Sequence, residues 1–308
     1  MTEKNVNLQR LMEANPLREP VLRTAIQALS LPPGSLGLDV GCGIGLQAML
    51  LADAVGDQGR VTGVDIDPDL TKFGTSLVGK AGYLDRITFR QGDMKNLPFE
   101  EDRFDWAWSA DCVGYPVGEI FPVLKELKRV VCPGGVIALI GWSSQQVLPG
   151  YQMLEARLNA TCSGLEPLLH GKRPEHHFLR SLGRLRQAGF DEVTAQTFVG
   201  TLQAPLGSLE KAAVTSLFKM LWGQPQPGVA PKDRAEYRRL CEPASADFVL
   251  NSDDYCAFFT LSMFQGRVPL QRQVHEYRER KRKAVPEKKR PRKGAGVSQK
   301  AITHRKAG

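Results

Sequence analysis

The chain has 308 residues, 42% of them hydrophobic, which is enough for one large or two small domains with an ordinary core. No run of about 18 apolar residues occurs, and the polar residues 1–20 lack the apolar segment of a secretory signal. The six cysteines are scattered without a CxxC pair, which argues against a zinc site or a disulfide framework. These features predict a cytoplasmic protein without a transmembrane segment.

The net charge of +8 is concentrated at one end of the chain. From Arg272 onward there are 14 Lys or Arg and 3 Asp or Glu, whereas the remainder holds 27 basic and 30 acidic residues. Such a basic segment with few apolar groups cannot offset the entropy of ordering, so residues 268–308 are predicted to be a disordered tail. The tail could contact nucleic acid or an anionic surface, and it resembles a nuclear-import signal if the source is eukaryotic. No feature of the sequence indicates an oligomeric state.

In the first half of the chain, hydrophobic periodicity predicts helices and strands in alternation. A helix is expected over 17–31 and is ended by "LPPGS". There follow a strand at 36–40, a helix at 46–54, a strand at 60–64, a helix at 69–81 with Asp67 as N-cap, strands at 87–91 and 104–109, a helix at 120–131 and a strand at 136–142. This alternation predicts βαβ units and a parallel sheet.

Beyond residue 142 the pattern changes. Helices are expected at 145–165, 178–188, 208–221 and 232–241, and strands at 192–198 and 255–266. About 55 residues separate those two strands, which is too long for a hairpin loop and predicts a helical insertion. Its apolar side chains could form a lid over an acceptor site or an ordinary packed face; they are Phe218, Met220, Leu221 and Trp222.

The segment "LDVGCGIGLQ" at 38–47 places a glycine-rich turn between a predicted strand and a predicted helix. Such a turn brings backbone N–H groups close to a ligand. The dinucleotide fingerprint has its third glycine five positions after the first, but here Gly45 comes only four positions after Gly41. Asp39 would repel a pyrophosphate and suits a ligand with an ammonium group. A nicotinamide cofactor is therefore disfavoured.

With this motif the sequence resembles the class I S-adenosylmethionine-dependent methyltransferases, in which a DxGCGxG turn wraps the methionine and ribose of the cofactor. The acid that ends the second strand, in "VTGVDID", matches the family's ribose-binding residue, and "GDM" matches its adenine site. The resemblance continues through "LPFEEDRFDWAWSAD" and "VLKELKRVVCPGGVIALIGW" and covers about residues 17–142. It is nearest to the ubiquinone and menaquinone biosynthesis methyltransferases. The cofactor residues that it implies are Asp39, Gly41, Cys42, Gly43, Gly45, Asp65, Ile66, Asp93, Met94 and Ser109.

The resemblance implies an α/β fold with a Rossmann-like, seven-stranded methyltransferase sheet, helices on both faces and helical insertions after strands five and six. The expected domain covers 1–267, with a cofactor-binding core at about 17–142 and substrate-side insertions at about 143–190 and 200–253. Purely structural roles for the motif residues stay open: the glycines could serve only a tight turn, Asp65 could cap a helix, Asp93 could be a loop acid, and Cys42 could fill a small space.

The implied activity is transfer of the methyl group of S-adenosyl-L-methionine to a small-molecule O, N or C nucleophile by in-line displacement. Such a reaction needs no metal, and it needs a base only if the acceptor must lose a proton. The acceptor is expected beyond the carboxyl ends of strands four and five. The substrate-side candidates are Asp111, Tyr115 and His177. Tyr115 could instead pack in the core, and His177 could be a surface or capping residue.

Other protein classes fit the sequence less well. A nucleic-acid methyltransferase using the basic tail is one alternative, but "SADCVGY" replaces the Asn/Asp-Pro-Pro-aromatic motif of the amino-methylating enzymes. An arsenite methyltransferase would need thiolates to converge, for which Cys112, Cys162 and Cys241 are candidates. A non-catalytic protein that binds the cofactor is a third alternative, although its motif residues are intact.

Overall fold

Seven strands form one mixed sheet in the described part of the chain, which covers residues 3–161, 173–223 and 228–270 of the computed structural model. The strand order is β3-β2-β1-β4-β5-β7-β6, parallel from β3 to β5, with β7 antiparallel to both of its neighbours. The strands are β1 (Leu36–Val40), β2 (Arg60–Asp65), β3 (Ile87–Gln91), β4 (Phe104–Ala110), β5 (Val131–Gln146), β6 (Asp191–Gln203) and β7 (Cys256–Arg267). The seven-stranded α/β sheet expected from the sequence is confirmed.

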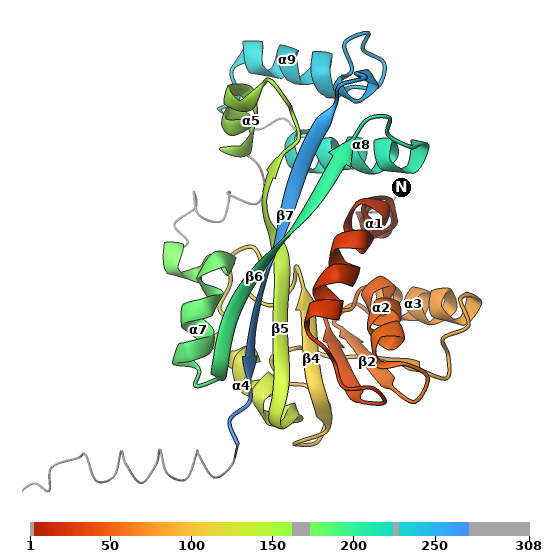
Figure 1. The fold of residues 1–308 in the computed structure, drawn as a ribbon, viewed down its shortest axis with the longest axis vertical. Coiled ribbons are helices and arrows are strands. Elements are labelled where there is room, and N and C mark those ends of the chain that lie inside the picture. Colours follow the sequence, from red (N-terminus) through yellow and green to blue (C-terminus); the bar gives the residue numbers. More distant parts are fainter. Residues whose placement is uncertain (1–2, 162–172, 224–227, 271–308) are drawn as a thin grey trace, which may run out of the picture. The chain divides into compact units, whose positions relative to one another are not determined.

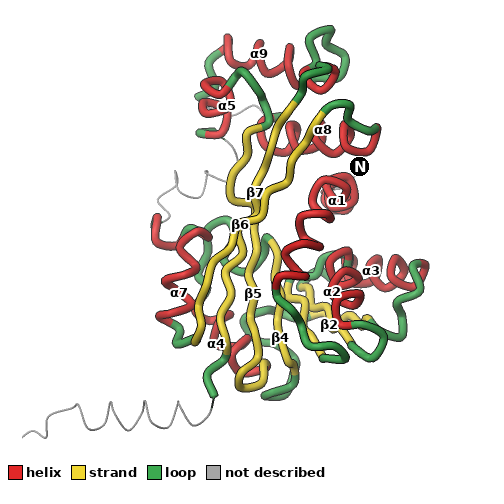
Figure 2. The backbone as a smooth tube through the Cα atoms, in the orientation of Figure 1, coloured by secondary structure: helices red, strands yellow, loops and turns green. Residues whose placement is uncertain are grey.

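Helices cover both faces of this sheet (Figures 1 and 2). One apolar cluster joins the sheet to α1, α2, α3 and α8, and a second joins it to α4 and α7. The helices are α1 (Glu3–Ala28), α2 (Leu46–Val55), α3 (Pro68–Lys80), α4 (Phe121–Val130), α5 (Gln152–Asn159), α7 (Ser181–Gln187), α8 (Ser208–Trp222) and α9 (Pro231–Cys241). Because one apolar layer lies on each face of the sheet, the central strands are buried on both faces, which explains their nearly continuous apolar sequence.

Local sequence determines where several of these elements begin. The Asp67 side chain accepts a hydrogen bond of 2.9 Å from the N–H of Asp69, and Pro68 occupies the first turn of α3. This confirms the predicted N-cap. The helix α2 begins directly after Gly45, so the glycine turn leads straight into a helix N-terminus.

The N-terminal helix begins 14 residues earlier than the spacing predicts, at Glu3 rather than at residue 17. It passes through Pro16 and Pro20, which lack the N–H that a continuous helix uses. In Figures 1 and 2 the helix changes direction part of the way along its length. Proline is the usual cause of such a bend.

The segment after strand five also differs from the prediction. Residues 145–146 continue β5 beyond an irregularity between Trp142 and Ser144, and the following helix α5 covers only Gln152–Asn159. The expected helix over 145–165 is therefore wrong at its start, and its end lies outside the described residues. The predicted disordered tail lies almost wholly outside them too, because the description ends at Leu270.

The strands β5, β6 and β7 are 16, 13 and 12 residues long, and they carry α5, α8 and α9 near one end (Figure 1). Phe218 and Trp222 of α8 are buried and stack at 5.7 Å, whereas Met220 is 46% exposed. For Phe218 and Trp222, the packed-face interpretation is thus confirmed.

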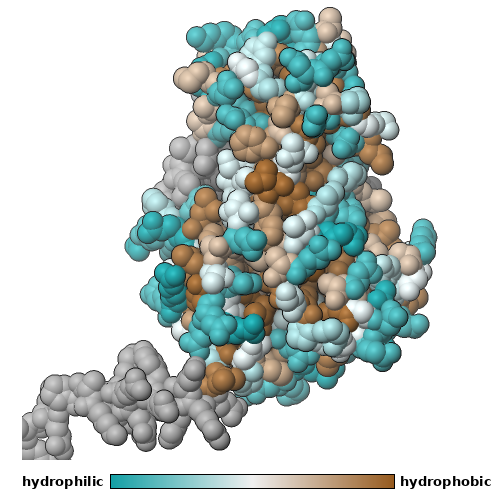
Figure 3. Space-filling model, in the orientation of Figure 1, coloured by the Kyte–Doolittle hydropathy of each residue, from teal (hydrophilic) through white to brown (hydrophobic). Residues whose placement is uncertain are grey.

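On the face shown in Figure 3, apolar atoms reach the surface near the middle of the long strands, among largely hydrophilic surroundings. Val199 on β6 is one exposed apolar side chain of these strands, at 60%. Within the described ranges, no helix is long and apolar enough to cross a membrane.

Candidate functional site

A cavity of about 290 Å³ lies at the carboxyl ends of β1, β2 and β4, which is where α/β sheets bind their ligands. One wall is the glycine turn, a second is the segment after β4, and α1 covers a third side. The lining residues are Leu11, Asn15, Arg18, Leu22, Gly41, Cys42, Gly43, Ile44, Leu46, Gln47, Asp65, Leu70, Ala110, Asp111 and Cys112.

The three glycines of the turn have left-handed backbones, with φ of 73°, 53° and 79° at Gly41, Gly43 and Gly45. A Cβ at Gly41 would lie 2.2 Å from Cys112 Sγ, and one at Gly45 would lie 2.4 Å from a Phe89 ring atom. A Cβ at Gly43 would have only Leu11 near it, at 3.6 Å. Packing therefore requires two of the glycines, while Gly43 presents bare backbone to the cavity.

Asp65, at the end of β2, bonds the glycine turn directly. Its Oδ2 accepts from the N–H of Gly43 at 2.8 Å, and its Oδ1 accepts from the N–H of Asp67 at 3.0 Å. An ionised carboxylate has about four lone-pair sites, so two acceptor sites are left for ligand hydroxyls. The geometry fits a ribose-binding acid that also holds the turn in place.

Asp39, on β1 just before the turn, is buried with 2% exposure, and its Oδ2 has no hydrogen-bond partner among the described residues. Burial, and secondly the negative charge of Asp65, raise the pKa of Asp39 to about 7. An unpaired buried acid is costly, and a cation bound beside it would relieve that cost. The carboxyl therefore fits the ammonium group of an amino-acid ligand.

Arg18 on α1 supplies the second unpartnered atom, because its buried Nε also lacks a hydrogen-bond partner in the described ranges. Its Nη2 forms an ion pair with Asp111 Oδ2. Leu11, Asn15, Arg18 and Leu22 line the cavity at helical spacing, so one face of α1 closes it. Sequence reasoning missed this face, although its spacing was a usable signal.

Asp111 follows β4 and adopts an uncommon left-handed backbone, with φ of 47°. Its Oδ1 accepts from the N–H of Trp142 at 2.9 Å, which ties it to the neighbouring strand β5 next to the irregularity in that strand. Asp111 is thus the one of the three substrate-side candidates that lines the cavity. Cys42 and Cys112 line it as well, and burial raises the pKa of both thiols, to about 11 for Cys112.

Ser109 is buried, and its hydroxyl group forms hydrogen bonds with backbone groups. Its Oγ donates to Val40 O at 2.9 Å and accepts from the N–H of Val113 at 3.3 Å. The side chain links β1 to the turn after β4 and does not line the cavity. Its expected role as a cofactor ligand stays a prediction.

The expected adenine residues lie next to Asp65. The N–H of Gly92 donates to Asp65 O at 3.0 Å, which brings the turn after β3 beside the end of β2. Asp93 Oδ1 accepts from the N–H of Lys95 at 2.8 Å, as a turn acid does. Ile66 is 69% exposed and Met94 is half-buried, and neither they nor Asp93 line the cavity. The adenine-binding role of Asp93 and Met94 and the cofactor-binding role of Ile66 stay predictions.

Tyr115 and His177 lie with the α4 and α7 cluster, on the other face of the sheet from α1. The Tyr115 ring contacts Phe178 edge-on at 5.5 Å and lies against Gly141, where a Cβ would be 2.7 Å from it. His177 Nδ1 accepts from the N–H of Leu179 at 3.2 Å, and burial lowers its pKa. The structure therefore favours packing for Tyr115 and capping for His177.

In the described ranges, no group of three or more His, Cys, Asp or Glu side chains is placed to hold a metal ion. Of the thiols considered for arsenite, Cys112 lines the cavity, Cys241 lies beside Glu155 near the ends of the long strands, and Cys162 is outside the described residues.

Known proteins resemble this chain in the part of the sequence that forms the cavity. The sequence model of the "Methyltransferase domain" family matches residues 38–135, which contain the glycine turn, Asp65 and Asp111. The demethylmenaquinone methyltransferase of Lysinibacillus sphaericus is 36% identical over 129 residues, which cover 41% of this chain and 52% of the relative. The chain thus spans about half the length of that relative.

The demethylmenaquinone methyltransferase of Staphylococcus haemolyticus is 30% identical over 196 residues, covering 58% of this chain and 79% of the relative. Among solved structures, a putative methyltransferase from Bacillus halodurans is 18% identical, with 80% of this chain and 98% of that chain covered at a TM-score of 0.49. From the family match and the extended relationship to the Staphylococcus protein, the chain belongs to the class I S-adenosylmethionine-dependent methyltransferases of the ubiquinone and menaquinone type.

Proposed function

We propose that this chain transfers the methyl group of S-adenosylmethionine to a small-molecule acceptor. The observation that carries the proposal is the buried, unpartnered Oδ2 of Asp39 behind a bare glycine turn that opens into the cavity. A phosphate-binding turn would not place an acid there, whereas an amino-acid ligand supplies the missing cation.

Each part of the site then has a task. Asp39 binds the ammonium group, Gly43 lets the ligand approach the backbone, and Asp65 accepts from the ribose hydroxyls. Residues 93–94 hold the adenine beside the end of β2. The cofactor supplies a methyl group on a positively charged sulfur, and α1 covers the cavity so that water is kept from it.

The acceptor is proposed to lie beyond Asp111, on the side of the long strands. The relatives are named demethylmenaquinone methyltransferases, which makes a quinol ring the first acceptor class to test. However, α5, α8, α9 and most of β5–β7 lie outside residues 38–135, the range of the family match. This part of the chain would set the acceptor specificity.

The test is binding followed by turnover. S-adenosylhomocysteine should bind the purified full chain in calorimetry, and labelled methyl groups should then appear in one member of an acceptor panel of quinols, phenols, amines and RNA. Binding with no transfer to any small molecule, but transfer to RNA, would support the nucleic-acid alternative instead. Absence of S-adenosylhomocysteine binding would refute the proposal. The cytoplasmic location and the role of the tail stay predictions.

A further inference from the structure

The two edge strands of the sheet differ in how they are protected from pairing with other chains. An edge strand presents unpaired N–H and C=O groups, and native proteins guard it by keeping it short or by placing charged side chains on it. The edge strand β3 has five residues and carries Arg90. At the opposite edge, β6 has 13 residues and pairs within the described chain with β7 alone (Figure 1). Length therefore does not protect β6.

Charge does not protect most of β6 either. Its acids, Asp191 and Glu192, lie at its start, before the irregularity in its pairing with β7. From Thr194 to Gln203 every residue has a partner in β7 without a further irregularity. The sequence contains no Asp, Glu, Lys or Arg over 193–209, although 24% of the residues in the chain are charged. The regular part of this edge thus has no charged side chain to repel another strand.

The described part of the chain also leaves this edge accessible. The side chains of residues 194–197 are all exposed, although successive residues of a strand point to opposite faces of the sheet. Val199 is 60% exposed, whereas Phe198 and Leu202 belong to the apolar cluster that includes α1 and α8. Both faces of β6 are therefore accessible over 194–197, and a second strand can approach the backbone between them.

We propose that β6 pairs with the β6 strand of a second copy of this chain, so that two seven-stranded sheets join edge to edge. A two-fold axis perpendicular to the sheets passes near Thr197 and makes the two strands antiparallel. Antiparallel edges related in this way complement each other, because each copy offers the same series of outward N–H and C=O groups. The inference does not depend on the proposed function.

The charge pattern favours a second copy over a partner of another sequence. A two-fold axis places residues of one segment opposite residues of the same segment, so a charge near the axis would face its own copy, and like charges directly opposite are destabilising. The absence of charge over 193–209 removes this repulsion. A partner of another sequence would not need it, because opposite charges could then stabilise the pair. The threonine, valine and phenylalanine of the segment are also favourable in strands.

The experiment measures the oligomeric state of the full chain by analytical ultracentrifugation over a range of concentrations. The wild type should dimerise with a dissociation constant of roughly 1–10 μM, as expected for a small interface. Thr197→Lys and Thr197→Glu should each weaken dimerisation by roughly tenfold or more, because like charges then meet near the axis.

Two control variants separate this effect from other causes. Thr197→Val removes the 2.9 Å hydrogen bond between the hydroxyls of Thr197 and Ser262 without adding a charge, and it should dimerise as the wild type does. Leu84→Lys adds the same charge at a 55% exposed position before β3, at the other edge of the sheet, and it should not change the dissociation constant.

Mixing the two charged variants tests whether two copies meet at this edge. An equimolar mixture of Thr197→Lys and Thr197→Glu should dimerise more tightly than either variant alone, because opposite charges then meet across the axis. Amide hydrogen exchange over 194–201 should also slow at high concentration in the wild type but not in Thr197→Lys. A purely structural role of the residue would produce neither result.

Three results would overturn the inference. The first is a wild-type chain that stays monomeric up to roughly 100 μM, well above the expected dissociation constant. The second is a dimer that both charged variants leave unchanged, which would place the interface elsewhere on the molecule. The third is a mixture of the charged variants that dimerises no more tightly than either variant alone.

Discussion

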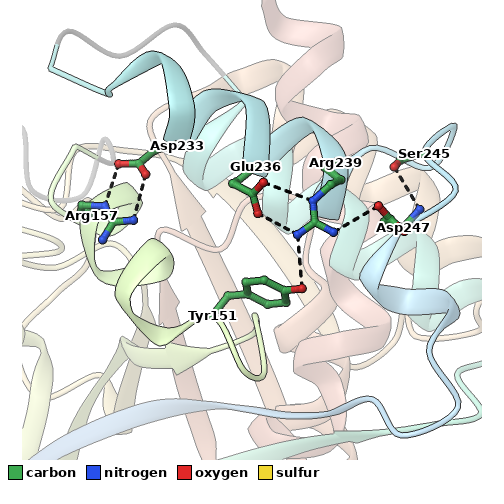
Figure 4. A network of polar contacts seen from close by, with 7 residues as sticks. All are labelled: Tyr151, Arg157, Asp233, Glu236, Arg239, Ser245 and Asp247. Carbon is green, nitrogen blue, oxygen red and sulfur yellow. Dashed lines mark hydrogen bonds and ion pairs between the residues drawn. The ribbon is translucent and has the colours of Figure 1, made fainter.

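Two polar regions of this molecule are built in opposite ways. In the helices beyond the long strands, charged groups satisfy one another: Arg157 binds both oxygens of Asp233, and Arg239 is shared by Glu236, Asp247 and Tyr151 (Figure 4). Around the glycine turn, two buried polar atoms have no partner in the described chain: Arg18 Nε, whose residue lines the cavity under α1, and Asp39 Oδ2, on β1 just before the turn.

Native proteins pair nearly all of their buried polar groups, so an unpaired one calls for a physical reason. In the network of Figure 4 the side chains form hydrogen bonds and ion pairs with one another. Around the glycine turn, by contrast, Arg18 Nε lacks an acceptor and Asp39 Oδ2 lacks a donor. We therefore interpret the region in which polar side chains pair with one another as structural, and the region with unpaired buried polar atoms as a binding site.

The largest expected effect comes from filling the bare part of the cavity. Gly43→Val places a β-branched side chain at a left-handed position and projects it into the cavity toward Leu11. Affinity for S-adenosylhomocysteine should fall by roughly 1,000-fold or beyond detection in calorimetry. The control is Gly150→Val, which carries similar backbone strain at φ 82° but has no atom within 4 Å of its Cβ position. Equal affinity in the two variants would contradict the placement of the site.

Removing the ribose-side acid should have the next largest effect. Asp65→Ala deletes two hydrogen bonds that the carboxylate accepts, from the N–H groups of Gly43 and Asp67, and two proposed bonds to the ligand. Affinity should fall by roughly 100-fold, because hydrogen bonds to charged groups are the strong ones. Asp57→Ala removes a 96% exposed acid and serves as the control. Retention of wild-type affinity by Asp65→Ala would remove this residue from the site.

The pH dependence tests whether Asp39 is the missing partner of a cation. Its pKa of about 7 lies above the usual 3.8, so its protonated form stabilises the ligand-free fold at low pH, and that contribution is lost as the pH rises to 7. An ammonium ligand requires the carboxylate. Affinity for S-adenosylhomocysteine should therefore rise by roughly tenfold between pH 6 and pH 8 and then level off.

Asp39→Asn provides the control for this profile. The variant cannot ionise at this position, so its affinity should be lower at pH 8 and nearly independent of pH over the same interval. Its ligand-free Tm should also fall less than that of the wild type as the pH rises. Parallel pH profiles for the two proteins would assign the titration to another group.

Local sequence was sufficient to predict the cofactor side of the fold. The strands, the N-cap at Asp67 and the glycine turn depend on neighbours within a few residues, and such patterns can be read directly. Even the placement of Asp39 behind the turn follows from its position two residues before Gly41. The acid at the end of β2 was predicted from its match to the ribose-binding residue of the family that the sequence resembles.

The rest depends on contacts between distant parts of the chain. Arg18 meets Asp111 across 93 residues, and no local pattern at either position indicates the other. His177 was a plausible base by chemistry, but the N–H of Gly118 donates to His176 O and draws its segment to the far face of the sheet. The lengthening of β5 likewise depends on pairing with β7, which is more than 100 residues away.

The smallest effect is expected in the network of Figure 4, where the polar side chains pair with one another. A substitution there tests whether such pairing is structural only. Arg239→Gln removes a guanidinium whose partners Glu236 and Asp247 are 43% and 59% exposed, so water can replace the lost bonds. Tm should fall by less than about 3 °C, and affinity for S-adenosylhomocysteine should stay within about twofold of the wild type. Arg18→Gln is the matched substitution in the cavity, where affinity should change much more than Tm. If Arg239→Gln weakened ligand binding as strongly, internal pairing of charges would not distinguish a structural region from a binding region in this protein.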